Sequence, residues 1–194
     1  MEEFLSRHWD QIAATDFFTV EVWTRTGLRR YMVLFFMDLS TRRVEIAGIS
    51  AIANGFWMGQ RARILTDAVD GLLKGKHYLI RDRDPLFTAE FLSTLAQAGT
   101  KSVKLPPRSP NLNSYAARFV RSIREGCLDR MILFGEEALR TAVREFVAHY
   151  HLERNYQGIG NVLIMPDPDV ANREGPIQCR SHLGGLLNYS DRAA

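Results

Sequence analysis

The fold is decided by Ile12–Trp23 (IAATDFFTVEVW), where β-branched and aromatic residues dominate. This composition favours a strand. The next apolar run, Tyr31–Met37 (YMVLFFM), has no polar alternation, as expected of a central strand buried on both faces. Arg43–Ile49 predicts a third strand. The short connections between these three strands indicate an antiparallel meander.

The hydrophobic period changes after the third strand. Apolar side chains recur at helical spacing from Trp57 to Leu72, with Asn54 as the expected N-cap and Gly75 as the expected C-cap. The remaining pattern predicts strands at residues 77–81 and 103–105, and helices at 88–99, after 113 and at 136–151. This order predicts an α/β fold with a mixed five-stranded sheet, in which two parallel strands join the three antiparallel ones and helices cover both faces.

Length and composition exclude several protein classes. The chain has 194 residues, of which 46% are hydrophobic, enough to fill the core of one domain. We expect a core at residues 1–154 and a tail or extension at 155–194, where the pattern fades. The sequence has no apolar run long enough to cross a bilayer and no signal-peptide pattern at its start. Its two cysteines suit a reducing compartment, so we expect a cytoplasmic protein.

Two aspartates stand out as candidate functional residues. Asp16 lies in the middle of an apolar strand, where a carboxylate is costly unless it is paired, hydrogen-bonded or bound to a metal. Asp82 follows the predicted strand at residues 77–81, at the end where sheet proteins often bind ligands. Two such carboxylates could hold Mg²⁺, which prefers oxygen ligands. Structural ion pairs are the alternative, with an arginine for Asp16 and with Arg81 or Arg83 for Asp82.

Basic residues gather in one segment. Residues 101–130 contain seven Lys and Arg against two Asp and Glu. This excess could bind phosphates, although a solvated helix face would look the same. The two histidines at the end of the last predicted helix, His149 and His151, lack the spacing of a zinc site. The apolar stripe from Leu139 to Tyr150 predicts a core or a dimer interface.

Three ordered motifs together resemble a known family. They are ATDFF at residues 14–18, IRDRDPLFT at 80–88 and PRSPNLNSYAARFV at 107–120, and the downstream YHLERNYQG at 150–158 extends the similarity. These motifs resemble the catalytic cores of bacterial DDE transposases and retroviral-type integrases, over roughly residues 11–161. The resemblance implies a ribonuclease-H-like fold and metal-dependent DNA cleavage and strand transfer, that is, DNA integration and recombination in a bacterial cytoplasm.

In this family, three carboxylates bind two Mg²⁺ or Mn²⁺ ions that assist an in-line phosphoryl transfer. Asp16 matches the first carboxylate, and Asp82 matches the second better than Asp84 does. The family's spacing places the third, a glutamate, at residue 117, which here is Ala. Glu125 cannot replace it, because it lies about 12 Å further along the helix. We therefore expect a second metal site that is weakened or absent.

The helix that carries residue 117 fits this register. Ala116, Phe119, Val120 and Ile123 form its inward stripe, which leaves residue 117 on the flank with the arginines. By resemblance, this flank and the loop before it would contact the DNA backbone. The expected DNA contacts are Lys104, Arg108, Asn111, Asn113, Arg118, Arg121 and Arg124.

Three functions compete at this stage. The leading hypothesis is a DDE-type strand-transfer core that is inactive, or nearly so, because residue 117 is Ala. The second is a non-catalytic DNA-binding or assembly module that retains the fold. The third is a nuclease that uses Asp16 and Asp82, with or without Asp84. The resemblance also implies a homodimer or higher homo-oligomer. Relatives usually carry a separate helix-turn-helix domain, for which the residues before the first strand leave no room.

Overall fold

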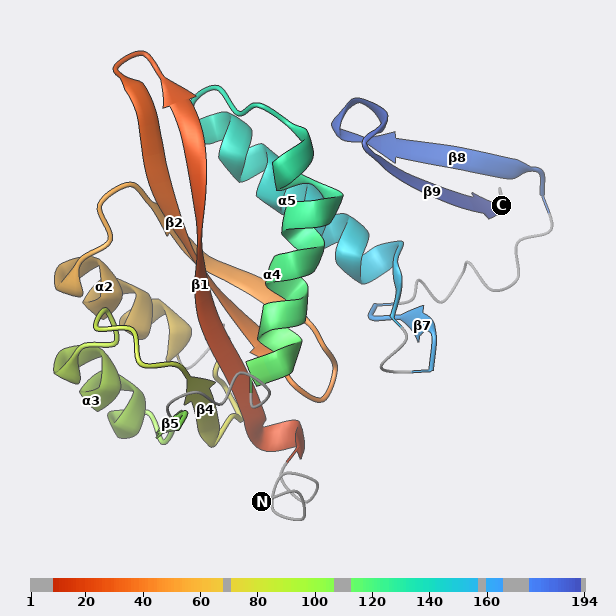
Figure 1. Cartoon of the computed structure of the whole chain (residues 1–194). Coiled ribbons are helices and arrows are strands. Elements are labelled where there is room, and N and C mark those ends of the chain that lie inside the picture. The colour runs from red at the N-terminus through yellow and green to blue at the C-terminus, as the bar shows by residue number, and fades with distance from the viewer. Residues whose placement is uncertain (1–8, 68–70, 107–112, 157–159, 166–174, 193–194) are drawn as a thin grey trace. The chain divides into compact units, whose positions relative to one another are not determined.

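The computed structural model describes residues 9–67, 71–106, 113–156, 160–165 and 175–192 (Figure 1). Short 3-10 turns precede the first strand (η1, Trp9–Gln11), follow α4 (η3, Leu128–Arg130) and join the last two strands (η6, Leu183–Gly185). The helices are α2 (Gly55–Leu65), α3 (Ala89–Gln97), α4 (Ser114–Gly126) and α5 (Glu136–Leu152). The strands are β1 (Ile12–Thr24), β2 (Gly27–Asp38), β3 (Val44–Ser50), β4 (Tyr78–Arg81), β5 (Lys101–Lys104), β6 (Asn155–Tyr156), β7 (Val162–Leu163), β8 (Ile177–His182) and β9 (Leu187–Arg192).

The chain forms two compact units. The first comprises Met1–Glu21 and Arg29–Val120, and the second comprises Val22–Leu28 and Arg121–Ala194. Helix α4 is therefore divided after Val120, so that its first half belongs to the first unit. The expected boundary between a core ending at residue 154 and a tail stays a prediction.

The five-stranded sheet has the expected topology. Its strand order is β3-β2-β1-β4-β5. β2 and β3 pair antiparallel, and β4 pairs parallel with both β1 and β5. β1 and β2 are joined by a two-residue connection, Arg25 and Thr26, and β2 begins at Gly27, whose φ of +108° glycine accepts without strain. The predicted α/β fold, with three antiparallel strands and two parallel additions, is confirmed.

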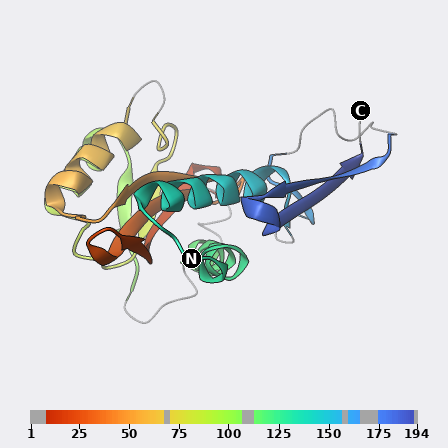
Figure 2. The same cartoon turned by 90° about the horizontal axis from the view of Figure 1, so that it is seen from above.

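Helices α2 and α3 cover one face of this sheet, where they lie side by side (Figures 1 and 2). The core there contains Leu34 and Phe36 of β2, which point to the same face because side chains alternate along a strand. The helices contribute fully buried side chains that include Met58, Ala62, Phe91 and Leu95. Helix α2 approaches β3 so closely that a Cβ on Gly48 would lie 2.7 Å from the Trp57 ring.

The opposite face is covered by the first half of α4. Phe35, the residue between Leu34 and Phe36, points to this face, and its ring centroid lies 4.8 Å from that of Phe119. Phe18 of β1 lies on the same face, with its ring centroid 6.0 Å from that of Phe35. Phe35 and Phe119 are fully buried. The predicted inward face of α4 is confirmed at Ala116, Phe119 and Ile123, whereas Val120 is only half-buried.

The helix predicted from Trp57 to Leu72 ends earlier, at Leu65. The hydroxyl of Thr66 donates to the carbonyl of Ala62 and the chain then turns, so that the amide of Leu73 donates to the carbonyl of Leu65. Leu73 reaches the core from this turn and is 4% exposed. The predicted helix is therefore wrong at Thr66 and at Leu72, while residues 68–70 of the predicted stretch lie outside the described residues. The N-caps expected at Asn54 and Thr88 are confirmed by side-chain hydrogen bonds to Trp57 and Phe91.

The second unit is built around α5, whose inward stripe includes Leu139, Val143 and Phe146. Two hairpins follow in the described residues, β6–β7 and β8–β9, neither of which the sequence pattern predicted. β6 and β7 have two residues each and β8 is exposed along almost its whole length, so these three strands lack the apolar alternation that marks a half-buried strand. None of the described helices is long and apolar enough to cross a membrane.

Candidate functional site

Asp16 and Asp82 lie level with each other on neighbouring parallel strands. Ala14 of β1 is the register partner of Ile80 of β4, and the two aspartates lie two residues beyond these partners. Adjacent strands are about 4.8 Å apart, and residues two apart point to the same face. Asp16 of β1 and Asp82, the residue that follows β4, therefore lie at matching positions where the β1–β4 ladder ends.

Asp16 lies on the face of the sheet that α4 covers. Phe18 follows Asp16 by two residues and contacts Phe35, whose ring meets Phe119 of α4. Phe17 points the other way, since its ring lies 5.0 Å from that of Phe87 on the α3 side. Alternation along β1 therefore places Asp16 on the side of the first half of α4.

Main-chain amides hold the carboxylates in place. The amide of Phe17 donates to Oδ1 of Asp16 at 2.8 Å. Beyond β4, the amide of Asp84 donates to Oδ1 of Asp82 at 3.1 Å, and the amide of Leu86 donates to Oδ1 of Asp84 at 2.8 Å. The segment after β4 is thus a tight turn in which each of the two aspartates accepts a hydrogen bond from the amide two residues further along the chain. Asp84 therefore has a local structural role.

The electrostatic environment of Asp16 is unusual for a carboxylate. Burial, and then the negative charges of Asp82 and Asp84, raise its pKa from 3.8 to about 6, against the opposing hydrogen bond from Phe17. Burial disfavours the charged form, and a like charge within a few ångströms does the same. Asp82 and Asp84 therefore lie near enough to Asp16 to disfavour its charged form.

The arginines next to Asp82 are directed elsewhere. Arg81 is buried, and its guanidinium donates to Oγ of Ser102 at 2.7 Å and to the main-chain carbonyl of Asp82 at 3.1 Å. Arg83 donates to the carbonyl of Leu105. Within the described part of the chain, neither Asp16 nor Asp82 forms an ion pair. The ion pairs that were the alternative explanation for these two aspartates are therefore not formed among the described residues.

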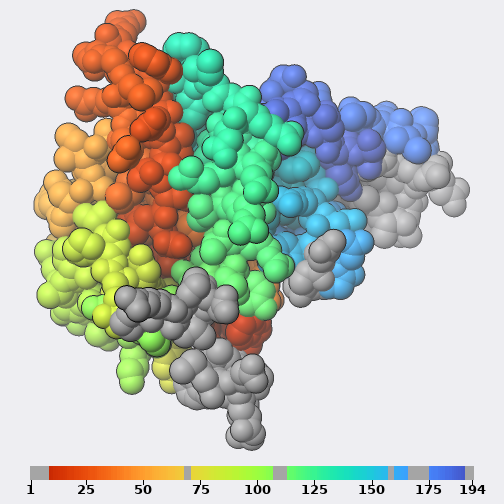
Figure 3. All heavy atoms as spheres, in the orientation of Figure 1, coloured from red at the N-terminus to blue at the C-terminus, as the bar shows by residue number. Residues whose placement is uncertain are grey.

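The start of α4 is fastened beside Asp16. Asn113 is 8% exposed, and its side-chain amide donates to the carbonyl of Thr15 at 3.3 Å. Ala117 lies about one helical turn further on and is exposed, so its methyl group has no role in the core. Figure 3 shows atoms of α4, in green, on the molecular surface. A side chain at position 117 would extend from the turn of α4 that follows this tether.

A second contact that holds α4 in place, made by Arg42, was not predicted from the sequence. The guanidinium of Arg42, in the turn between β2 and β3, lies 3.7 Å from the ring centroid of Tyr115 and 5.2 Å from that of Trp9. Arg42 is 4% exposed, and its Nε and Nη1 atoms have no hydrogen-bond partner. An arginine in a turn between strands is normally solvated, so the sequence contains no signal for this stack.

The predicted DNA-contacting residues do not all belong to one unit. Lys104 and Arg118 are exposed in the first unit, while Arg121 is exposed and Arg124 half-buried in the second. Arg108 and Asn111 lie outside the described residues. Asn113 differs from its expected role, because its buried amide is already bound to Thr15. The exposed members of the set remain predicted DNA contacts.

The carboxylates match only part of a two-metal centre. Their oxygen atoms suit a hard cation such as Mg²⁺, which often takes one or two carboxylates and completes its shell with water. In the described ranges, no group of three or more His, Cys, Asp or Glu side chains is arranged to hold a metal ion. Asp16 and Asp82 supply carboxylate oxygens of the kind that Mg²⁺ prefers, and Ala117 supplies no third carboxylate.

Comparison of sequences finds no relative of this chain, whereas comparison of structures does. No protein-family model and no curated protein matches the chain. Among solved structures, the catalytic domain of Mos1 mariner transposase matches 76% of this chain and 76% of its own, with a TM-score of 0.57 and 19% identity.

The catalytic core domain of HTLV-2 integrase in complex with magnesium also matches. Its dimeric form covers 73% of this chain and 86% of its own, with a TM-score of 0.53 and 10% identity. Its trimeric form covers 79% and 93%, with a TM-score of 0.54 and 10% identity. At these identities the likeness establishes the fold: the chain has the ribonuclease-H-like fold of transposase and integrase catalytic cores.

Proposed function

We propose that this chain is the catalytic core of a DDE-type DNA transposase or integrase that has lost its third metal-binding carboxylate, at Ala117. The observation that carries this proposal is the matching placement of Asp16 and Asp82 where the β1–β4 ladder ends, with Asp16 on the α4 side of the sheet. Asp16 is a desolvated carboxylate with no ion-pair partner among the described residues, which destabilises a fold, so a ligand-binding role accounts for it better than a structural one.

The reaction class would be in-line displacement at a DNA phosphodiester. Divalent cations would supply charge neutralisation of the phosphate and activation of the attacking oxygen. Asp16 and Asp82 would hold such a cation, while Asn113 and Arg42 hold the first turn of α4 against β1. Without a carboxylate at position 117 the second cation would be bound weakly or lost. Several kcal/mol of transition-state stabilisation would go with it, enough to abolish useful turnover.

The partner would be DNA, held by its backbone at the exposed Lys104 and Arg118. Binding of this kind is salt-dependent and weakly specific for sequence. A homodimer or higher oligomer fits the proposal, because the matching HTLV-2 integrase cores are described in dimeric and trimeric forms. The alternative is a non-catalytic DNA-binding or assembly module, favoured by the exposed Ala117 itself.

The decisive experiment restores the missing acid. We would compare wild type, Ala117→Glu, Ala117→Gln and the double variant Ala117→Glu/Asp16→Asn for nicking and joining of end-labelled DNA with Mg²⁺ or Mn²⁺. Because Ala117 is exposed, both substitutions should be accepted without repacking. The Gln variant matches Glu in size but lacks its charge, so it controls for shape.

We expect activity only in Ala117→Glu, and loss of that activity when Asp16 is also replaced. If Ala117→Glu binds DNA as tightly as wild type but never cleaves it, the assembly-module alternative is favoured. If the unmodified chain cleaves DNA with a divalent cation, position 117 is dispensable. The site would then belong to a nuclease that uses Asp16 and Asp82.

A further inference from the structure

The hairpin of β8 and β9 has almost no core of its own. All β8 side chains except the last, His182, are exposed, including Ile177 at 71%. Among residues 177–190, Leu187 is the one buried side chain. A two-stranded hairpin is at best marginally stable in water, so contacts outside it must hold it in place.

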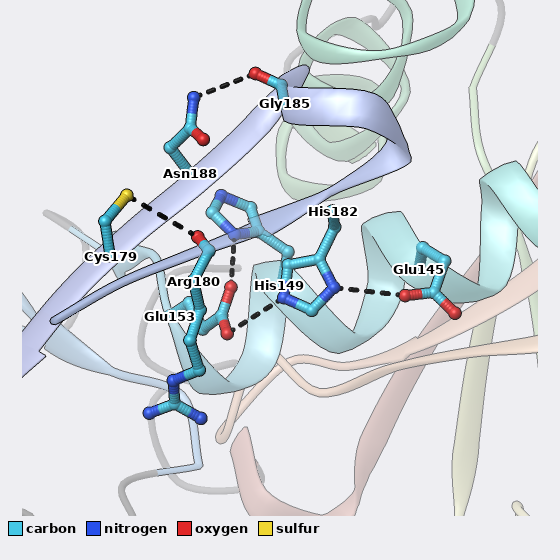
Figure 4. A network of polar contacts seen from close by, with 8 residues as sticks. All are labelled: Glu145, His149, Glu153, Cys179, Arg180, His182, Gly185 and Asn188. Atoms are coloured by element: carbon cyan, nitrogen blue, oxygen red, sulfur yellow. Dashed lines mark hydrogen bonds and ion pairs between the residues drawn. The ribbon is translucent and has the colours of Figure 1, made fainter.

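His182 supplies such contacts from the end of β8 (Figure 4). Its Nδ1 atom lies 3.1 Å from Oε2 of Glu145, and its Nε2 atom lies 3.1 Å from Oε1 of Glu153. Glu145 belongs to α5, and Glu153 is the C-cap residue of that helix, about two helical turns further along. The imidazole therefore bridges two carboxylates of one helix face, and both of its nitrogens are used.

This geometry requires two protons on the ring. An ionised carboxylate only accepts hydrogen bonds, and a neutral imidazole has a single N–H. In a neutral ring one nitrogen would turn its lone pair towards a carboxylate oxygen, which is repulsive. The imidazolium form donates to both carboxylates and also forms two ion pairs.

The other charged groups around the bridge agree with a cationic ring. Glu153 is largely buried and also pairs with Nδ1 of His149 at 2.8 Å, while Glu145 pairs with Arg144 at 3.6 Å. On the hairpin side, the Arg180 guanidinium lies over the Tyr189 ring. The three carboxylate contacts of the two histidines thus form one connected network along the C-terminal half of α5.

We propose that His182 is a proton-dependent latch that holds the C-terminal hairpin on α5, closed when its imidazole is protonated and released when it is neutral. The hydrogen bond to Glu153 raises the pKa of His182 above its ordinary 6.5, with burial opposing and Glu145 adding to the effect. Burial raises the pKa of Glu153, but the hydrogen bonds from His149 and His182 outweigh it and lower that pKa overall.

The direction of the pH effect follows from linkage. A histidine whose pKa is raised in the folded state contributes its full stabilisation below about 6.5, the value in the released state. The contribution is lost as the pH rises through the folded-state pKa. A single proton changes the closing equilibrium by at most about tenfold per pH unit.

The test measures amide hydrogen exchange of residues 177–190 in the full chain between about pH 5.5 and about pH 8.5, with rates divided by the intrinsic exchange rates. NMR titration of the histidine rings gives the pKa of His182, whose signals are assigned from their loss in His182→Gln. Glu145→Gln removes one of the two acceptors. The control is His77→Gln, since His77 lies in the other unit and contacts only Gln11 through its ring in the described hydrogen bonds.

In wild type and His77→Gln we expect His182 to titrate above 6.5. Hairpin protection should fall by at most about tenfold per pH unit between about pH 6.5 and that raised pKa, and level off above it. In His182→Gln, protection should be low at every pH. In Glu145→Gln, the His182 titration should move to lower pH. A His182 pKa at or below 6.5, or constant protection in wild type across the range, overturns the proposal. The wild-type measurements alone decide it if a variant fails to fold.

Discussion

Asp16→Asn should stabilise the protein at neutral pH in metal-free buffer. Asn keeps the shape of the side chain and an Oδ1 acceptor for the amide of Phe17, which lies 2.8 Å away. It removes the charge that burial and the neighbouring Asp82 and Asp84 disfavour. If Asp16 belonged to a structural ion pair, the same substitution would destabilise the protein, because it would leave the partner's charge unpaired.

The magnitude follows from the pKa of Asp16, which is about 6 in the folded protein against an ordinary 3.8. At about 1.4 kcal/mol for each pH unit, the difference corresponds to about 3 kcal/mol, or about 2 kcal/mol after allowance for solvent around a half-buried group. Because the folded state binds this proton more tightly, the penalty grows as the pH rises from 3.8 to about 6 and is complete above that.

The assay is urea unfolding of wild type and Asp16→Asn with a chelator present, near pH 4 and near pH 7. The control is Glu125→Gln, which removes an exposed carboxylate from α4 and should change stability by less than about 0.5 kcal/mol. Added Mg²⁺ should narrow the gap, since it binds wild type more tightly than the variant. A variant no more stable than wild type at pH 7, or equally stabilised at both pH values, would refute the electrostatic argument.

Three further substitutions test other parts of the structure. Arg42→Ala removes the buried guanidinium over Tyr115 and should lower the free energy of unfolding by about 2 kcal/mol in urea, with Arg42→Lys intermediate. Lys76→Met removes a 2.8 Å ion pair with Asp38, whose pKa is lowered because hydrogen bonds, chiefly from Lys76, outweigh burial. Asp38 stabilises the fold only when ionised, so the loss, about 2 kcal/mol, should be complete at pH 7 and shrink as the pH falls below 3.8, as thermal unfolding across that range would show. Lys104→Gln should weaken DNA binding equally for all sequences and reduce the slope of log affinity against log salt by roughly one, as measured by fluorescence anisotropy.

The sequence predicted the first unit well because its elements obey simple periodicities. The three first strands are long and rich in β-branched and aromatic residues, and Asn54 and Thr88 are ordinary N-caps. The alignment of Asp16 with Asp82 was also within reach, because parallel strands bring their carboxyl ends to one edge. Residue 117 was identified from motif spacing, and its exposure agrees with the predicted helix face.

The rest depended on contacts between residues distant in sequence. The end of α2 at Leu65 is set by Thr66 and a following turn, which carry no signal strong enough to interrupt an apolar period. The Arg42 stack requires Tyr115, which is more than seventy residues away. The contact of His182 with Glu153 joins residues that are 29 positions apart in the sequence. The strand that carries His182 is exposed and shows no alternation of apolar and polar residues.

The exposure of Ala117 has a genetic consequence. Alanine codons begin with GC and glutamate codons with GA, so a purine-ending alanine codon becomes a glutamate codon through one base change. A buried alanine would resist that change, because the larger side chain would force the core apart. At an exposed position the scaffold offers no such resistance. The fold therefore sets no packing barrier to an acid at this position, and a single base change could introduce one without any compensating change elsewhere.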